Sequence, residues 1–159
     1  MSPEFSHLDP DGKVRMVDVG EKEITRREAV AEAAVRMSEA AYAALRSGTV
    51  NKGDALATAR LAGIQAAKRT SELIPLCHAV PLDAVDVQVE FDDAGHRVVL
   101  RASASARWYT GVEMEALTAV TVAALTLYDM CKSADRAMVI EQVVLLRKSG
   151  GRSGEFRRV

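Results

Sequence analysis

Cysteines and aromatic residues are scarce in this sequence. Only two cysteines, Cys77 and Cys131, occur among 159 residues, and they are far apart with no CxxC spacing. Neither a disulfide framework nor a zinc site is therefore expected. Aromatic residues make up 4% of the chain and the formal net charge is −1, so the sequence lacks the stacking side chains and basic surface of nucleic-acid-binding proteins. We expect no nucleic-acid partner.

Long apolar runs, repeats and linkers are also missing. No apolar stretch reaches the roughly 20 residues that a membrane helix needs, and the first residues lack the apolar core of a signal peptide. No repeat or Pro/Gly-rich linker divides the chain. With 48% hydrophobic and 27% charged residues, we expect one compact domain over residues 1–159, with flexible ends at 1–13 and 148–159. A cytoplasmic protein without a membrane partner follows from these absences.

The hydrophobic pattern predicts a mixture of strands and helices. Residues 28–37 have a helix-like composition, but their apolar side chains fall on alternate positions, which favours a strand. We expect strands at 15–19, 28–37, 85–91, from 97 onward and 138–146, and helices at 38–46, 54–70 and 113–134. Helices interleaved with an antiparallel hairpin predict an α+β fold, a ferredoxin-like antiparallel sheet with helices packed on one face.

A lysine stands at the mouth of the second predicted helix. Free backbone N–H groups and the helix dipole favour an anion such as phosphate there, so Lys52, which precedes Gly53 and Asp54, could bind phosphate or exchange protons. The alternative is a solvated lysine before an Asp N-cap.

Two further segments carry titratable side chains. His78 ends the apolar, proline-bent segment LIPLCH, where a partly buried histidine could titrate near neutral pH or be purely structural. Cys77 has no Lys or Arg beside it in sequence, which indicates a packed thiol rather than a nucleophile. Glu113 and Glu115 lie in the first turn of the longest predicted helix, where the dipole stabilises carboxylates, although ordinary helix starts look the same.

The other end of this long helix carries an acid and a base. Asp129 and Lys132 are three residues apart and share one helix face, which suits acid–base chemistry but is also common in simple salt bridges. Glu113 and Lys132 are separated by about 28 Å at 1.5 Å per helical residue. If both ends of the helix serve one substrate, the site must be assembled from two subunits of a symmetric oligomer.

The C-terminal segment KSGGRSG, residues 148–154, is rich in glycine and cations. Its backbone amides could surround phosphate oxygens, or it could be a flexible tail that orders when a polyphosphate binds. The histidines, His7, His78 and His96, lack the close spacing of metal ligands, so no bound metal is expected.

Five segments together resemble one family. They are MVDVG from Met16, KGDALATARLAGIQAAKRT from Lys52, LIPLCH from Leu73, TGVEMEALTAVTVAALTLYDMCK from Thr110 and KSGGRSGEF from Lys148. In this order they resemble the cyclic pyranopterin monophosphate synthase (MoaC) family of molybdenum cofactor biosynthesis. The resemblance implies a lyase that converts 3′,8-cyclo-7,8-dihydro-GTP to cyclic pyranopterin monophosphate and pyrophosphate. It also implies a ferredoxin-like subunit, a homohexamer built as a trimer of dimers, sites at the dimer interfaces, and no resident cofactor, although Mg²⁺ can accompany the triphosphate.

The resemblance also implies residue roles. Lys52 and Lys132 would be the catalytic lysines and Asp129 an acid–base group. The substrate-binding residues would be Leu76, Cys77, His78, Glu113, Met114 and Glu115, with Arg26, Lys148 and Arg152 as candidates for holding the triphosphate.

Two features of the chain depart from the family pattern. Ala79 stands where the family has proline, and Trp108 and Tyr109 stand where polar residues are commoner, which affects loop shape rather than chemistry. The rival function is a ligand-binding module of the same fold without catalysis, and the presence of both lysines favours catalysis. An RNA-binding domain is disfavoured because the stacking aromatics are missing from the predicted strands.

Overall fold

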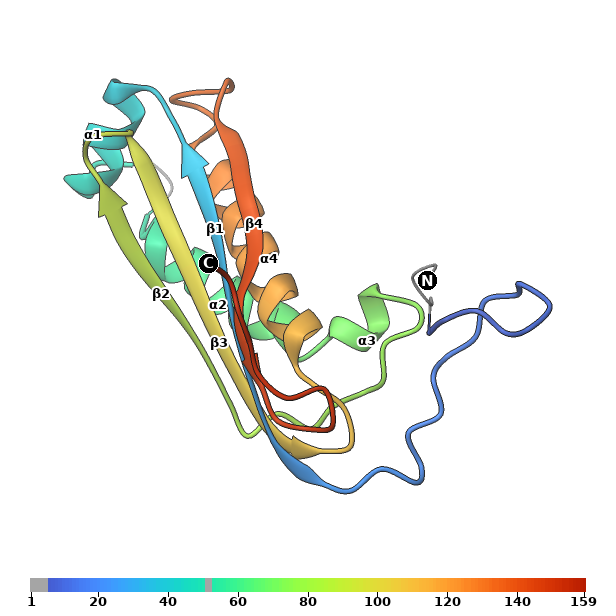
Figure 1. Cartoon of the computed structure of the whole chain (residues 1–159). Coiled ribbons are helices and arrows are strands. Elements are labelled where there is room, and N and C mark those ends of the chain that lie inside the picture. The colour runs from blue at the N-terminus through green and yellow to red at the C-terminus, as the bar shows by residue number, and fades with distance from the viewer. Residues whose placement is uncertain (1–5, 51–52) are drawn as a thin grey trace.

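The computed structural model describes residues 6–50 and 53–159, and its centre is an antiparallel sheet. The strands are β1 (Thr25–Arg36), β2 (Ala84–Asp92), β3 (Arg97–Trp108), β4 (Val139–Ser149) and β5 (Phe156–Arg157). Their order across the sheet is β2-β3-β1-β4-β5 (Figure 1). The predicted α+β class is confirmed, and β1 lies between β3 and β4 because both pair with it along most of its length.

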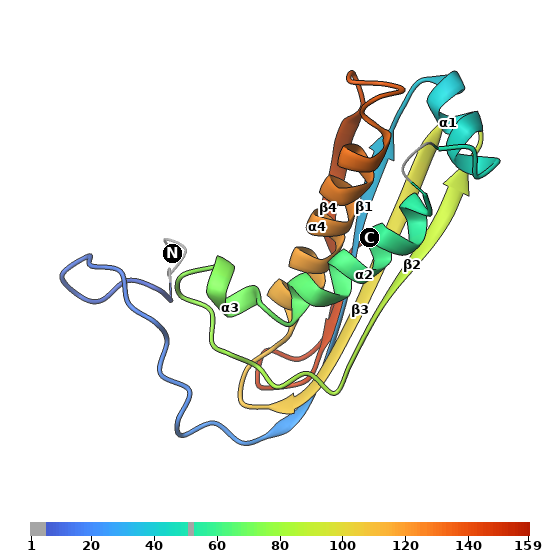
Figure 2. The ribbon, with the colours of Figure 1, turned by 180° about the vertical axis from the view of Figure 1, so that it is seen from behind.

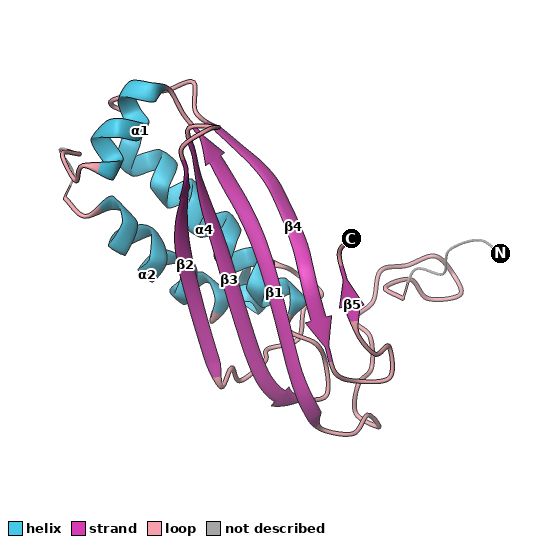
Figure 3. Cartoon of the chain, turned by 60° about the vertical axis from the view of Figure 1, so that its left-hand side comes forward, coloured by secondary structure: helices cyan, strands magenta, loops and turns pink. Residues whose placement is uncertain are grey.

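The helices lie on one face of this sheet, as Figures 2 and 3 show. They are α1 (Glu39–Arg46), α2 (Ala55–Ala67), α3 (Thr70–Leu73) and α4 (Glu113–Cys131). Both α1 and α2 begin at a capping residue: the side chain of Ser38 accepts from the Ala41 amide, and that of Asp54 accepts from the Ala57 amide. The first two helices therefore begin where their capping residues predict.

Small side chains bring the sheet and the helices close together. The inward positions of β1 are Ala29, Ala31, Ala33 and Val35, and all four are buried. On α2, a Cβ at Gly63 would stand 2.8 Å from the carbonyl oxygen of Ala119 on α4, so glycine is what allows the two helices to touch. The alternation that predicted a strand at 28–37 is thus the alternation that builds the core.

The longest helix, α4, is apolar over most of its surface. By length and composition alone, α4 could cross a membrane, and it is the one helix among the described residues that could. However, 56% of its most apolar window is buried in the fold. Core helices of globular proteins have this composition too.

The opposite sheet face is free of helices and carries charged side chains. Arg101 of β3 lies between Glu32, at 2.6 Å, and Glu90, at 3.2 Å, one on each neighbouring strand. Such cross-strand pairs fit a solvated sheet face. The β2–β3 hairpin therefore has one solvated face.

Some predicted boundaries are wrong. Residues 15–19 form no strand, because they lie in an N-terminal arm that runs away from the sheet and has no neighbouring strand to pair with (Figure 1). Among the described residues of this arm, the β-pairing is limited to an isolated bridge between Leu8 and Val14. The long helix ends at Cys131 rather than at 134, because a turn follows in which the Ala134 amide donates to the Cys131 carbonyl. The last long strand extends to Ser149 because its end pairs with β1, where Ser149 lies opposite Glu28.

Candidate functional site

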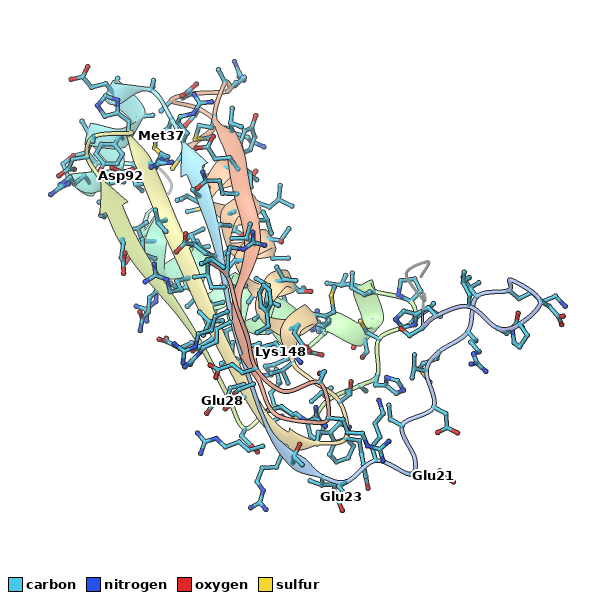
Figure 4. The ribbon with its side chains drawn as sticks, in the orientation of Figure 1. Glu21, Glu23, Glu28, Met37, Asp92 and Lys148 are labelled. Atoms are coloured by element: carbon cyan, nitrogen blue, oxygen red, sulfur yellow. The ribbon has the colours of Figure 1, made fainter. Side chains whose placement is uncertain are left out.

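The candidate residues gather at the two ends of α4. The helix begins close to where β1 starts, since the preceding Trp108 pairs with Thr25. It ends close to where β1 finishes, since Asp135, just after the helix, accepts from the Ser38 amide at 2.8 Å. Figure 4 shows these ends apart, with Met37 and Asp92 at one and Glu23 and Lys148 toward the other.

A pocket at the N-terminal end of α4 unites two of the predicted substrate-binding segments. This acidic pocket is lined by His7, Leu76, Cys77, His78, Val80, Thr110, Gly111, Glu113, Met114 and Glu115. All six residues expected to bind substrate at 76–78 and 113–115 are therefore together, although more than thirty positions separate the two segments in sequence. The connection Trp108–Gly111 turns the chain from β3 into α4 and brings the two glutamates into the pocket.

Burial controls the protonation of this pocket. Glu115 is only 4% exposed, and its burial, with the nearby negative charge of Glu113 as a smaller cause, raises the pKa of Glu115 to about 7. Burial, and secondarily the charge of Glu115, also raises the pKa of the Cys77 thiol. Cys77 is thus held as a thiol, which agrees with the packing role expected for it.

A second pocket lies where the N-terminal arm, β1 and the C-terminal turn meet. This basic pocket is lined by Glu21, Lys22, Glu23, Thr25, Arg27, Gly151, Arg152 and Ser153. Gly151 has a φ of +74° and follows Gly150 at +97°, and a Cβ at Gly151 would collide with the Arg27 guanidinium. The two glycines therefore fold the C-terminal turn directly over that guanidinium.

Arg27 is the buried cation of the basic pocket. Its residue is 8% exposed, and its guanidinium donates to the carbonyl oxygens of Trp108 at 3.3 Å and Tyr109 at 3.0 Å. No carboxylate among the described residues pairs with it. The hydroxyl oxygen of Thr25, in the same pocket, is buried without a hydrogen-bond partner. A cation and a hydroxyl in this state are suited to an anionic ligand.

Arg26, the arginine expected at the triphosphate, does not line the basic pocket. Successive strand residues face opposite sides of a sheet, so Arg26 lies on the helix-free face, where its side chain is 77% exposed and pairs with Glu28 at 2.6 Å. Lys148 lies opposite Ala29 in the register, on the same face as Arg27, and its ammonium contacts the hydroxyl of Ser153. Our reading of the sequence missed Arg27, although it continues the inward alternation of Ala29 and Ala31.

The expected acid–base pair lies at the other end of α4. The Lys132 ammonium is 2.7 Å from the Asp129 carboxylate, and the two side chains are 50% and 56% exposed. Lys52 lies outside the described residues, and Asp54, which follows it, caps α2. Within one chain, the structure does not bring Asp129 and Lys132 to the acidic pocket, because the length of α4 separates them.

These features define a class of protein: a ferredoxin-like α+β fold whose two adjoining pockets, one acidic and one basic, suit a small anionic substrate. Residues 16–151 match the MoaC family, and the chain belongs to that family.

Relatives from bacteria and animals match the chain along nearly its whole length. The cyclic pyranopterin monophosphate synthase of Bordetella avium is 59% identical, covering 98% of this chain and 96% of its own. That of Rhodopirellula baltica is 55% identical, covering 98% and 94%. The human molybdenum cofactor biosynthesis protein 1 is 52% identical over 99% of this chain and 25% of its own length. These matches confirm the predicted family and the prediction that the protein is an enzyme.

The buried carboxyl of Glu115 makes stability depend on pH. Because its folded pKa of about 7 lies above the ordinary 4.5, the folded state keeps a proton that the unfolded state loses between these values. Stability contributed by this group is complete near pH 4.5, declines as the pH rises toward 7 and is absent above it. Glu115→Gln removes this ionisation. We therefore expect the free energy of unfolding of the variant, relative to that of wild type, to rise by on the order of 2 kcal/mol from pH 5 to pH 8.

Urea unfolding at both pH values and one protein concentration measures this difference. Glu72→Gln, on an exposed position of α3, is the control and should leave the pH dependence unchanged. If the free energy of unfolding changed equally with pH in wild type and in Glu115→Gln, the raised pKa of Glu115 would be contradicted.

Proposed function

We propose that this chain is a cyclic pyranopterin monophosphate synthase, a lyase that acts on 3′,8-cyclo-7,8-dihydro-GTP and releases pyrophosphate. One observation carries the proposal: the acidic pocket and the basic pocket adjoin each other across the Trp108–Gly111 turn. Arg27 contacts the carbonyls of Trp108 and Tyr109, while Thr110 and Gly111 line the acidic pocket. A substrate with a guanine-derived ring and a triphosphate needs two such neighbouring subsites.

The acidic pocket is suited to the ring. A guanine-derived ring presents N–H donors beside a carbonyl acceptor, so its partner must both accept and donate hydrogen bonds. Glu115, with a pKa of about 7, can do either near neutral pH, and Glu113 and His78 add further polar atoms from the same pocket. Leu76 and Met114 supply apolar contact beside them.

The basic pocket is suited to the phosphates. Arg27 and Arg152 line it, and Lys148 reaches Ser153, which also lines it. Cations here offset the charge of a triphosphate and stabilise the negative charge that builds as pyrophosphate departs. Any Mg²⁺ would arrive with the triphosphate rather than as a resident cofactor.

The acid–base residues come from a second copy in this proposal. Lys52, Lys132 and Asp129 act on the ring, and two copies related by a two-fold axis place the C-terminal end of one α4 against the acidic pocket of the other. The helix side is the suitable contact, since the sheet separates α4 from the helix-free face. It exposes Leu61 on α2 and Leu125 on α4, each at 57%, as an interface would require. A homohexamer of three such dimers is the proposed cytoplasmic assembly.

Turnover tests the activity directly. Incubation with 3′,8-cyclo-7,8-dihydro-GTP should release pyrophosphate and a pterin that becomes fluorescent on oxidation. Lys52→Ala, Lys132→Ala and Asp129→Asn should each lower kcat by about a hundredfold or more, because positioned acid–base groups contribute about 10²–10⁴-fold. Lys13→Ala, on the exposed N-terminal arm, is the matched lysine control. If wild type binds the nucleotide without forming either product, the chain is a binding module instead.

Mixing two inactive variants tests the shared site. Glu115→Ala removes the donor and acceptor atoms of this side chain from the acidic pocket, and Asp129→Asn removes the acid–base group of the other half. A heterodimer of the two variants therefore contains one intact site and one doubly damaged site. Unfolding and refolding the two together should restore about a quarter of wild-type activity, the share of intact sites in a random mixture of dimers. Each variant refolded alone is the control. No recovery in mixtures shown by mass spectrometry to contain both chains would mean that each site lies within one chain.

Adjacent arginines give a matched pair for the phosphate subsite. Arg27→Gln should raise KM at least about tenfold, because a charge-assisted contact to phosphate contributes about 1.5–3 kcal/mol. Arg26→Gln should change KM by less than about twofold if its exposed pair with Glu28 is only a surface ion pair. The reverse result would assign the triphosphate to Arg26. Thermal unfolding of both variants separates lost binding from lost folding.

A further inference from the structure

The N-terminal arm brings one side chain to the acidic pocket. The described residues that line this pocket include one from before β1, and that residue is His7. Figures 1 and 2 show the arm leaving the start of β1, running outward and returning beside α3. The segment that carries His7 is therefore distant in sequence from the rest of the pocket and reaches it from the open side of the domain.

A small hairpin holds His7 in place. The Arg15 amide donates to the His7 carbonyl at 2.9 Å, and Leu8 bridges to Val14. At the tip, the Asp9 carboxylate accepts from the amides of Asp11 at 3.0 Å and Lys13 at 2.8 Å, an Asx-type closure of the turn. These bonds give residues 7–15 a defined shape, although the exposed fractions of Leu8 and Val14 are 41% and 74%. Apolar burial is therefore not what positions the hairpin.

One nitrogen of the His7 imidazole contacts the backbone of the hairpin. Its Nδ1 lies 3.4 Å from the Arg15 carbonyl oxygen, a contact that the Nδ1–H tautomer makes by donation. In that tautomer Nε2 is a hydrogen-bond acceptor. The pocket would then hold an acceptor on the arm facing the carboxyls and imidazole contributed by α4 and the 76–78 segment.

From this geometry we infer that His7 is a substrate-contacting residue: the hairpin 7–15 forms a wall of the acidic pocket, and His7 accepts a hydrogen bond from an N–H group of the guanine-derived ring. The inference rests on the proposed function for the chemistry of the ring. It extends the site to a segment that precedes the sheet and adds specificity for ring N–H donors, which the triphosphate subsite cannot supply.

Binding to two probes tests this role. In the Asp129→Asn protein, which should consume substrate at least about a hundredfold more slowly than wild type, calorimetry measures the affinity for 3′,8-cyclo-7,8-dihydro-GTP and, separately, for inorganic triphosphate. Adding His7→Ala should weaken nucleotide binding about three- to tenfold, the equivalent of one hydrogen bond, and leave triphosphate binding unchanged. Lys13→Ala, in the same hairpin but outside the pocket lining, should affect neither. Asp9→Ala, which removes the turn closure, should reproduce the selective loss with His7 intact.

Steady-state kinetics completes the test. With Asp129 restored, His7→Ala should raise KM with kcat within about twofold, since the contact is made in the bound ground state as well as in the transition state. His7→Gln, which retains an acceptor, should recover part of the affinity. Unchanged nucleotide affinity, or an equal loss for both probes, overturns the role of His7. If wild type turns over substrate while the His7 test fails, the proposed function still holds. If wild type does not turn over substrate, both the proposed function and the role of His7 are overturned.

Discussion

The length of α4 is the constraint on which the candidate site depends. Nineteen residues in one unbroken helix, Glu113–Cys131, hold the acidic pocket and the Asp129–Lys132 pair apart by nearly the full length of the sheet. The packing that fixes this distance is close: Gly63 lets α2 touch α4, and the alanines of β1 lie beneath. A helix packed in this way cannot bend to bring its ends together. Completing one site from both ends therefore requires two chains, and oligomerisation becomes part of the catalytic proposal.

Most of the fold could be predicted from the sequence because local pattern and tertiary packing agree. In β1, alanines favour helix by propensity, yet their period of two decides the outcome, since a helix would scatter these side chains around its axis. The capping residues Ser38 and Asp54 are local signals too, and both mark true helix starts. The predicted strand at 15–19 is wrong for the complementary reason. A strand needs a partner strand to satisfy its backbone, and no strand in the described part of the chain pairs with residues 15–19.

The candidate site was less predictable because its parts meet through topology. Segments 76–78 and 113–115 were named through family resemblance, and the structure shows that they share a pocket. The meeting of residues 21–27 with 151–153 depends on strand register between β1 and β4, which no local pattern contains. The inward direction of Arg27 could have been predicted, since Arg27 and not Arg26 shares the parity of Ala29. His7 carried no signal of its own, because the returning arm that brings it to the pocket has neither periodicity nor a cap.

A carboxyl that is neutral near pH 7 suits this site physically. Two glutamates in one helical turn repel each other, and burying Glu115 to 4% exposure adds a desolvation cost. The helix N-terminus offsets part of that cost, since its free amides favour negative charge. The balance leaves Glu115 able to change protonation state near neutrality, so its carboxyl can either donate or accept a hydrogen bond. In the proposed dimer, a second copy covering the pocket would remove water, which raises this pKa, and would bring Lys132 toward the carboxyl, which lowers it. The protonation of Glu115 in the proposed dimer is therefore set by the balance between the water that is lost and the positive charge that is added.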